Sequence, residues 1–321
     1  MVGEKSPCLQ RRLCQVLYAP EPSLFRYPIP RMGLKYTNGK AVHSIQFSKP
    51  SDATKRFILF YGHRESNLGA SVLIHPVPAR SEHVLDFQFA DEIQIHDLHD
   101  GIKRSAKSAA LIGLQTHRRV EQVIRGRIES FSVFLQPAAL SLLFGLPAIV
   151  VTNTDLDAHG VLGRFVGGLR ERLGNCGSFL ERVRVAEEFF IDLSSKTPRF
   201  DLVESVAHEI RRQNGVCQVE AVARSAGLSS RTLHRRFKQS IGLSPKIFAR
   251  IVRFESALQT KATSPKLRWT DIAHEYGYHD QMHMVHDFHS LSTDTPSGLL
   301  RHLENMFSGD LSTVEKTHIL L

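Results

Sequence analysis

Long apolar runs are missing from this sequence. The longest, residues 140–151, covers about a dozen residues and contains Pro147, whereas a membrane-spanning helix needs about 20 apolar residues. The opening residues, MVGEKSPCLQRRLC, include no apolar segment of the kind found in signal peptides. We therefore expect neither a signal peptide nor a membrane span.

Paired cysteines and enzyme motifs are also missing. The four cysteines, Cys8, Cys14, Cys176 and Cys217, include no Cys-x-x-Cys pair, so they are typical of reduced cytosolic thiols and not of a disulfide framework or a zinc site. The sequence contains no Gly-x-Ser-x-Gly elbow, no Walker loop and no dinucleotide-binding glycine motif. We expect no catalytic residues, no cofactor and no metal.

An excess of positive charge is present instead. The 321 residues include 41 Lys and Arg against 32 Asp and Glu, a formal net charge of +9, and the pI is near 9.5. A basic protein favours a polyanionic partner such as nucleic acid. With 42% hydrophobic and 23% charged residues, the chain is otherwise an ordinary globular protein, long enough for two domains.

The first 135 residues alternate short β-prone runs with turn residues. Strands of this length at this spacing predict a β-sandwich or a small barrel. The runs lie at residues 56–61, 71–77, 83–89, 108–115 and 128–135.

Beyond Pro137 the pattern becomes helical. Residues 138–146 predict a short helix, and residues 156–173 and 178–193 predict an antiparallel helix pair. The sequence SSKTP at 194–198 predicts a linker. It divides the chain into a β-rich domain with C-terminal helices (1–197), a helical domain (198–305) and a disordered tail (306–321).

Near the C-terminus one pattern of small, apolar and capping residues occurs twice, with offsets of 50, 50, 51, 51 and 51 residues. The alanine allows close helix packing, the glycine supplies a positive φ, and the apolar pair four residues apart forms a buried stripe. Each copy therefore predicts a helix-turn-helix, whose second helix enters the DNA major groove as a recognition helix. The copies are Ala223, Gly227, Leu233, Phe237 and Ser244-Pro245, and Ala273, Gly277, Met284, Phe288 and Thr295-Pro296.

Helices are also predicted before and between the copies. Residues 200–213 carry apolar residues at helical spacing, and Ser244-Pro245 is a strong start signal for a connector helix at 246–261. A rigid connector would hold the two recognition helices about 34 Å apart, as successive major-groove faces require. The expected buried stripes are Leu202, Val203, Val206, Ala207 and Ile210 in the first helix, and Ile247, Ile251, Phe254 and Leu258 in the connector.

The segments GLSSRTLHRRFKQSIGLSPKIFARIVRFESAL and WTDIAHEYGYHDQMHMVHDFHSLSTDTPSGLL resemble the DNA-binding domain of AraC-type transcriptional regulators. The resemblance covers roughly residues 216–303. A weaker resemblance includes the stretch PAALSLLFGLP at 137–147 and extends over the upstream part. It implies an α+β fold, in which a β-rich N-terminal domain with a helical pair senses a ligand or mediates dimerisation. An all-α domain of two helix-turn-helix modules joined by a connector helix follows.

The first recognition helix carries basic residues on its outer side, because Leu233 and Phe237 face inward. The resemblance implies that Arg231, His234 and Arg235 read bases, and an arginine can pair with the edge of guanine. Lys238, one turn further along, is placed for phosphate. Arg250 and Arg253 on the connector are either phosphate contacts or solvent-facing residues. Arg236 lies nearer the inward side, where it could form a salt bridge within the domain.

The two modules differ in net charge. Residues 216–261 contain nine Lys and Arg against two acids, which leaves +7, whereas residues 262–321 contain four against eight, which leaves −4. Where the resemblance leads one to expect arginines, the second recognition helix has His286, His289 and Ser290, and Thr293-Asp294 replaces the expected glycine. We therefore expect this module to bind DNA weakly. Its base-reading candidates are Gln281, Met282 and His286.

The histidines leave two further readings. His279, His283 and His286 share a helix face that could ligate zinc or nickel, but the resemblance places that face toward the DNA groove. A histidine close to phosphates also predicts a pH-dependent contact at His286. His96 and His99 form a second, weak metal candidate, but at such turn-like positions these residues are more often part of a polar loop.

The expected function is sequence-specific DNA binding by a bacterial transcription regulator, located in the cytoplasm with the nucleoid. Its partner is double-stranded promoter or operator DNA; RNA polymerase, a second copy of the chain and a small-molecule effector are left open, and no membrane is expected. The alternative is a DNA-repair or other enzyme that uses an AraC-like module for DNA targeting, but the zinc-bound cysteine cluster of repair methyl acceptors is absent. A DNA-packaging protein is disfavoured by the acidic second module.

Overall fold

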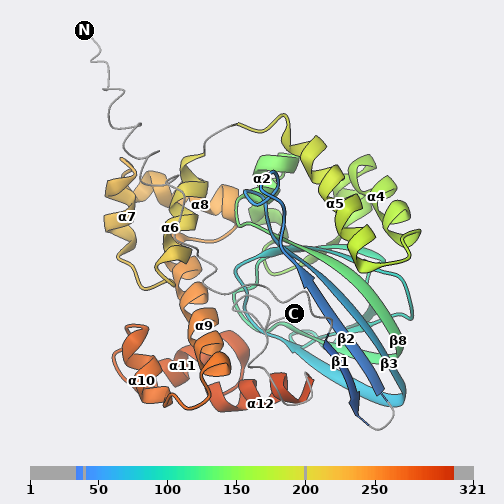
Figure 1. Ribbon diagram of the computed structural model, residues 1–321. Coiled ribbons are helices and arrows are strands. Elements are labelled where there is room, and N and C mark those ends of the chain that lie inside the picture. Colours follow the sequence, from blue (N-terminus) through green and yellow to red (C-terminus); the bar gives the residue numbers. More distant parts are fainter. Residues whose placement is uncertain (1–33, 39–40, 199–200, 307–321) are drawn as a thin grey trace.

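The computed structural model describes residues 34–38, 41–198 and 201–306 (Figure 1). In this part of the chain an antiparallel β-sheet with covering helices is followed by a helical region. The expected α+β fold class is therefore confirmed. The predicted tail lies outside the described residues except for its first residue, Met306, where the last helix ends.

Two long strands, β3 (Ile58–Val77) and β8 (Val120–Leu135), form the centre of the sheet. They pair antiparallel along most of their length, with an irregularity between Asn67 and Val72. Among the described residues, nine strands form one sheet in the order β1-β2-β3-β8-β4-β7-β9, and β5 pairs with β6 and with the far end of β8. The others are β1 (Leu34–Asn38), β2 (Ala41–Ser48), β4 (His83–Gln88), β5 (Gln94–Asp97), β6 (Lys103–Ser105), β7 (Ala109–Ile112) and β9 (Asp155–Asp157).

Strand lengths differ from the prediction. The runs at 56–61 and 71–77 were expected as separate strands, but both belong to β3, because the residues between them continue to pair with β2 and β8. The run at 128–135 is only the second half of β8. The turn-like residues around Gly69, which has a φ of +54°, make a bulge in one strand and not a boundary between two.

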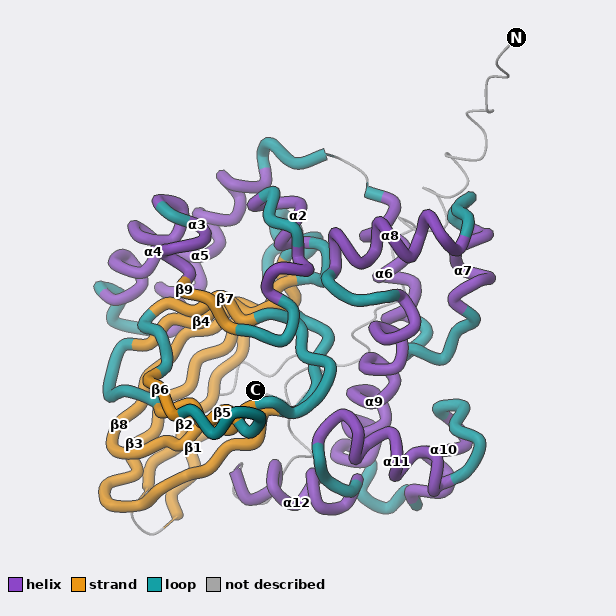
Figure 2. The backbone as a smooth tube through the Cα atoms, turned by 180° about the vertical axis from the view of Figure 1, so that it is seen from behind, coloured by secondary structure: helices purple, strands orange, loops and turns teal. Residues whose placement is uncertain are grey.

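Helices cover one face of the sheet (Figures 1 and 2). The expected short helix after Pro137 is present, and α4 and α5 form the expected pair. Their core is apolar and aromatic: Phe131 and Tyr61 from the sheet and Phe179 and Phe190 from α5 are buried in one cluster. The elements are α2 (Ala139–Phe144), the 3₁₀ turn η1 (Ala148–Val151), α3 (Ala158–Leu162), α4 (Arg164–Gly174) and α5 (Phe179–Ser194).

The single helix predicted at 156–173 is wrong. Its first residues form β9, which pairs with β7, and the remainder is divided between α3 and α4 at Gly163. Gly163 has a φ of +57°, and its backbone N–H donates to the carbonyl of His159, which ends α3. Apolar spacing alone could not show this turn or the strand pairing.

The helical region begins with the predicted helix, which is capped by Asp201 and buries all the expected stripe except the half-buried Leu202. The connector helix begins at Pro245 and is capped by Ser244, as predicted. One residue of its expected stripe is wrong: Ile247 is 41% exposed, and Phe248 is buried in its place. The helices are α6 (Leu202–Arg212), α7 (Val219–Ser225), α8 (Ser230–Ile241), α9 (Pro245–Thr263), α10 (Trp269–Glu275), α11 (Gln281–Ser292) and α12 (Pro296–Met306).

The sheet and helical halves are in direct contact. Ala79, Leu114 and Ala138 from the sheet half are buried in the same cluster as the core of the helical half. Arg56 forms an ion pair of 2.7 Å with Glu204 on α6. The predicted linker falls between α5 and α6, and the domain division itself stays a prediction.

None of the helices in the described segments is both long and apolar enough to cross a membrane. Cys176 and Cys217 are free thiols in the structure, whereas Cys8 and Cys14 lie outside the described residues.

Candidate nucleic-acid interface

The two copies of the sequence pattern form two similar helix pairs, α7–α8 and α10–α11, on either side of α9 (Figure 1). The turn has the same geometry in both. Gly227 and Gly277 have φ values of +69° and +66°, and the residue after each glycine donates its backbone N–H to the carbonyl of the motif's alanine at 2.9 Å. The glycine is required because other residues rarely adopt this conformation.

The second helix of each pair begins with a side-chain cap. The hydroxyl of Ser229 accepts the backbone N–H of Thr232 at 3.2 Å, and the carboxylate of Asp280 accepts the backbone N–H of His283 at 2.7 Å. Such caps satisfy backbone donors that a helix start leaves unpaired. They fix where α8 and α11 begin, and hence which side chains lie on their outer faces.

The inward faces of both helices pack on the connector. Phe237 of α8 meets Phe248 of α9 edge to face at 5.4 Å between ring centres, and Phe288 of α11 meets Phe254 of α9 at 4.7 Å. Aromatic pairs in this geometry add to the free energy gained from burial. Because both phenylalanines pack on one continuous helix, α9 sets the position of α8 relative to α11.

The outer face of α8 is basic and exposed. Arg231, His234, Arg235 and Lys238 are all exposed, as the sequence predicted from the inward positions of Leu233 and Phe237. Arg236 is exposed too, which corrects the expectation of an inward position. None of these basic side chains is ion-paired with a described residue, so their charges are available to a ligand.

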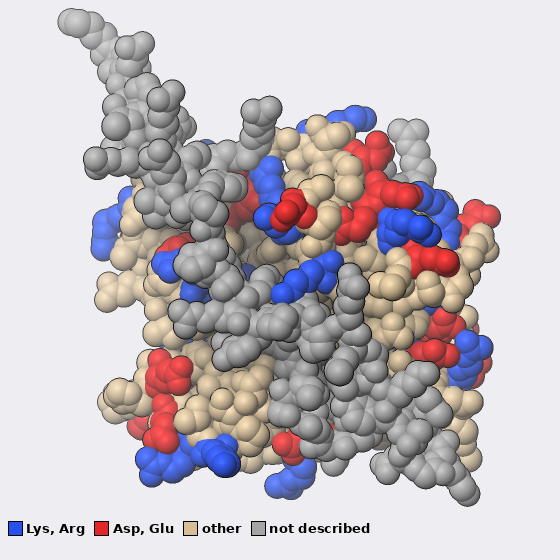
Figure 3. All heavy atoms as spheres, in the orientation of Figure 1, with Lys and Arg blue, Asp and Glu red and all other residues tan. Residues whose placement is uncertain are grey.

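The outer face of α11 is exposed but carries different chemistry. Gln281, Met282 and His286 all lie on the surface, with Met282 59% exposed. At the helix end, Thr293 takes the left-handed conformation with a φ of +60° that Gly242 adopts after α8. Its scaffold therefore matches that of α8 although its surface does not. In Figure 3, acidic and basic side chains lie next to each other over the lower left region, which α10–α12 occupy in Figure 1.

Arg250 and Arg253, expected at phosphates or in solvent, meet a buried carboxylate. Both are ion-paired with Asp287 of α11, Arg253 at 3.6 Å, and Asp287 is only 5% exposed. Tyr278 donates its hydroxyl to the same carboxylate at 3.2 Å, and Arg253 stacks over the tyrosine ring. Burial and the charge of Asp287 raise the pKa of Tyr278, which keeps this hydroxyl a donor. Arg250 remains 38% exposed and can still reach outward.

The histidines that were candidate metal ligands make contacts with different residues. His279 donates its backbone N–H to the Nδ1 of His283 at 3.2 Å, and its own Nδ1 lies 3.1 Å from Asp280. His96 lies 3.6 Å from Glu121. Within the described residues no cluster of three or more histidine, cysteine or acidic residues is arranged to hold a metal ion.

Comparison with known families decides what the two modules are. Residues 222–302 match a family described as a helix-turn-helix domain. This segment is an AraC-type helix-turn-helix domain. The match covers α8, α9, α10 and α11 completely and includes most of α12. An AraC-type domain supports a DNA-binding transcription regulator, with DNA as the partner, and such regulators are typically not enzymes.

Solved structures of ToxT are similar to this chain only distantly. ToxT from Vibrio cholerae O395 has 15% sequence identity and a TM-score of 0.43, covering 77% of this chain and 98% of that chain. Unsaturated fatty acid-bound wild-type ToxT from Vibrio cholerae strain SCE256 has 11% identity and a TM-score of 0.43, covering 83% of this chain and 97% of that chain. None of the curated proteins matches the chain.

Two acidic residues around the AraC-type domain were not predicted. Asp287 interrupts the inward stripe between Met284 and Phe288, and an acid next to a buried phenylalanine was a signal that could have indicated an internal partner. Glu255 of α9 accepts hydrogen bonds from the backbone and side chain of Ser81, 174 residues away in the chain, at 2.7 and 2.6 Å. No local pattern could have found this second contact.

Proposed function

We propose that this protein is a sequence-specific transcription regulator that reads two successive major-groove faces with α8 and α11, and that α8 provides most of the affinity. The observation that carries the proposal is the contrast between two recognition helices on the same scaffold. The outer face of α8 presents exposed, unpaired Arg231, Arg235 and Lys238. The corresponding positions of α11, 51 residues further on, are Met282, His286 and His289.

Base reading and phosphate contact are assigned to different residues of α8. Arg231, His234 and Arg235 lie on the first turns of the helix, whose N-terminal part contacts base edges in helix-turn-helix proteins. Lys238 lies one turn later and binds phosphate. On α11, Gln281, Met282 and His286 read bases with less affinity, since they supply no fixed positive charge.

The connector supplies the remaining phosphate contacts. Arg250 is the better placed of its two arginines, because it is partly exposed and its other side is held by Asp287. Arg253 is more buried and stacks on Tyr278, so its contribution is mainly to hold Arg250 and α11 in position.

Residues 1–197 form a sensor or dimerisation domain, residues 198–305 form the DNA-binding domain and residues 306–321 form a tail. Exposed apolar residues on α5, Leu180 at 70% and Ile191 at 45%, support self-association through the helix pair. Sedimentation of the protein in solution measures this self-association directly. RNA polymerase is a further partner in this proposal.

Substitutions on α8 test the assignment. Arg235→Ala should weaken binding to the preferred site by about 1 to 3 kcal/mol and relax the preference at one base pair. Lys238→Ala should weaken binding to all sequences alike. It should also reduce the slope of log affinity against log salt concentration by about 1. The preferred site comes from genome-wide mapping of bound DNA, and binding is then measured on matched and mismatched duplexes at several salt concentrations.

The control is Arg224→Ala, which removes an exposed arginine from α7 instead of the recognition helix. If Arg235→Ala leaves affinity and preference unchanged, or changes them no more than Arg224→Ala does, the orientation assigned to α8 is wrong.

A further inference from the structure

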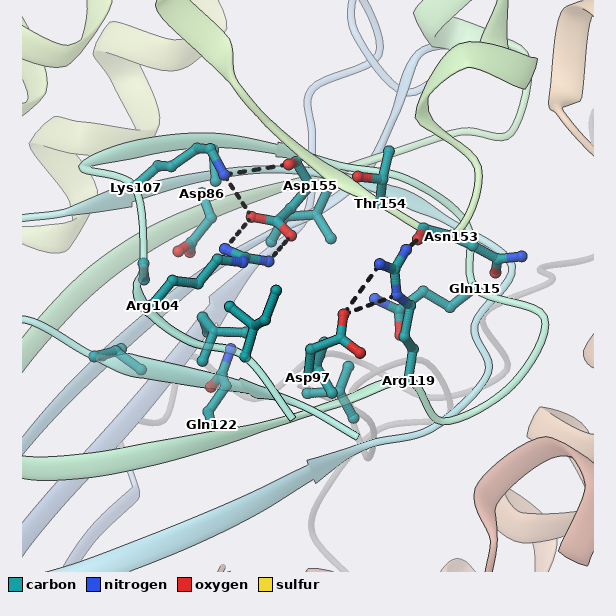
Figure 4. Close-up of a pocket in the computed structure, with 18 of the residues that line it drawn as sticks. Asp86, Asp97, Arg104, Lys107, Gln115, Arg119, Gln122, Asn153, Thr154 and Asp155 are labelled. Carbon is teal, nitrogen blue, oxygen red and sulfur yellow. Dashed lines mark hydrogen bonds and ion pairs between the residues drawn. The ribbon is translucent and has the colours of Figure 1, made fainter. Parts of the chain in front are cut away.

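A cavity of about 240 Å³ lies in the sheet half, beside β4–β8 and the segment that leads into β9 (Figure 4). Its volume corresponds to roughly eight water molecules at about 30 Å³ each, enough for a small metabolite. Apolar walls and polar groups alternate around it. The apolar walls include Ile93, Ile95 and Ile112.

Three of the four cationic side chains that line the cavity already have partners. Asp155 forms ion pairs with Arg104 and, at 2.9 Å, with Lys107, and Figure 4 shows all three converging. Arg119 is paired with Asp97 at 3.0 Å. These pairs form part of the cavity wall, and they leave none of the three cations free to bind a ligand.

The fourth cation, Arg80, is different. Arg80 lines the cavity and is only 9% exposed, and its buried Nε has no hydrogen-bond partner. Its guanidinium makes no direct ion pair with any residue that the structure describes, although the charges of nearby carboxylates act on it. Its backbone is fixed, because Arg80 and Gln115 exchange both backbone hydrogen bonds at 2.9 and 3.1 Å. A buried charge without a partner is costly, and proteins keep one mainly where a ligand supplies the missing partner.

Four carboxylates lie near enough to act on Arg80, but each makes its hydrogen bonds or ion pairs with other residues. Asp155 is held by Arg104 and Lys107, and Glu255 by Ser81. Asp86, which also lines the cavity, accepts the hydroxyl of Ser132 at 2.6 Å and a hydrogen bond from Gln88. Glu82 lies 3.8 Å from Arg211 of α6. The side-chain amide oxygen of Gln115, a residue of the cavity wall, has no partner among the described residues and is available to a ligand donor such as a hydroxyl or amine.

We propose that this cavity binds a small carboxylate, with its carboxyl group on the guanidinium of Arg80 and its carbon skeleton against the isoleucine wall. A carboxylate matches the planar fork of an arginine with two parallel hydrogen bonds. Binding gives the guanidinium of Arg80 the direct partner that no described side chain supplies.

The segment around Arg80 connects this site to the second helix pair, through α11, and to the supporting helices α6 and α9. Ala79 donates its backbone N–H to the carbonyl of Leu291, in the last turn of α11, at 2.9 Å. Ser81 is hydrogen-bonded to Glu255 of α9 and accepts a hydrogen bond from Arg211 of α6 at 2.8 Å. A carboxylate on Arg80 therefore fixes a segment that contacts α6, α9 and α11, and alters DNA affinity. This second step rests on the proposed function.

Thermal unfolding of the full chain tests the site without DNA. Succinate in large excess over its Kd should raise the Tm of the wild type by about 3 °C or more, relative to sodium chloride at equal ionic strength. Arg80→Met should abolish this rise. It should also raise the Tm without ligand, because it removes an unpaired buried charge, whereas Arg104→Met should lower it by leaving Asp155 short of a partner.

Arg80→Lys gives a second measure if Arg80→Met folds poorly, and its succinate shift should be smaller because lysine lacks the fork. Acetate and benzoate serve as smaller and flatter probes. The site is overturned if none of the three carboxylates shifts the wild-type Tm, or if they shift Arg80→Met equally.

Coupling is tested on DNA of the preferred site. Succinate should change the wild-type affinity about fivefold or more, and Ser81→Ala should keep the succinate Tm shift while losing most of this effect. If succinate shifts the Tm through Arg80 but leaves the DNA affinity unchanged, the carboxylate site stands and the coupling to DNA binding is overturned. A chain that binds succinate but no DNA contradicts the proposed function alone.

Discussion

At the scale of single residues, Asp287 is a buried acid of the helical half with three side-chain partners. Its buried carboxylate receives Arg250, Arg253 and the hydroxyl of Tyr278, and so joins α9 to α11. We expect Asp287→Ala to lower the free energy of unfolding by about 2 to 4 kcal/mol, because it leaves two cations and a buried hydroxyl without their acceptor. Urea unfolding followed by circular dichroism measures the change.

Asp271→Ala provides the matched control, since Asp271 is also ion-paired with an arginine, Arg268, but at an exposed site. Its effect should be much smaller, as is usual for surface pairs. Equal losses for the two variants would show that burial does not strengthen the Asp287 contacts.

At the scale of elements, α8 and α11 differ in charge and not in construction. His286 occupies the position on α11 that Arg235 occupies on α8, and both are exposed. We expect His286→Arg to raise DNA affinity and to steepen the salt dependence by about 1 in the log–log slope, because it adds one cation that displaces a counterion. Fluorescence anisotropy over a salt series on a labelled duplex measures this slope.

Val72→Arg adds the same charge to an exposed position on β3, in the sheet half. It should leave the slope nearly unchanged. If the two variants steepen the slope equally, net charge and not the position on α11 controls DNA binding.

The elements also show how far sequence reasoning extends. The spacing of Ala223, Gly227 and Phe237 predicted the first module because helix caps, glycine turns and buried stripes are local properties of the chain. The division of 156–173 into a strand and two helices depended on pairing with β7, which local periodicity does not encode. The partners of Asp287 and Glu255 depended on tertiary packing, so the candidate surface was predictable while the contacts that hold it were not.

At the scale of the whole molecule, two buried histidines make stability depend on pH. Burial is the main cause that lowers the pKa of His75 on β3 and of His83 on β4 to about 3. In the unfolded chain a histidine titrates near 6.5, so their stabilising contribution is complete above that pH and is lost as the pH falls toward 3. At pH 5.5 the loss relative to pH 7.5 should be about 1.4 kcal/mol for each histidine.

Urea unfolding at pH 7.5 and pH 5.5 gives this difference. His83→Gln cannot bind the proton, so its loss should be about 1.4 kcal/mol smaller than that of the wild type, while the other titrating groups are common to both proteins. A pH dependence that is identical in His83→Gln would mean that His83 is protonated as readily in the folded as in the unfolded chain.

The shared core of the two halves has a thermodynamic consequence. Ala79, Leu114 and Ala138 belong to the sheet half by sequence but are buried with the core of the helical half, so opening either half exposes apolar surface of both. The free energy of unfolding is therefore a property of the chain as a whole. Anything that binds the folded sheet raises the free-energy cost of opening the DNA-binding helices by mass action, even if no atom of those helices moves.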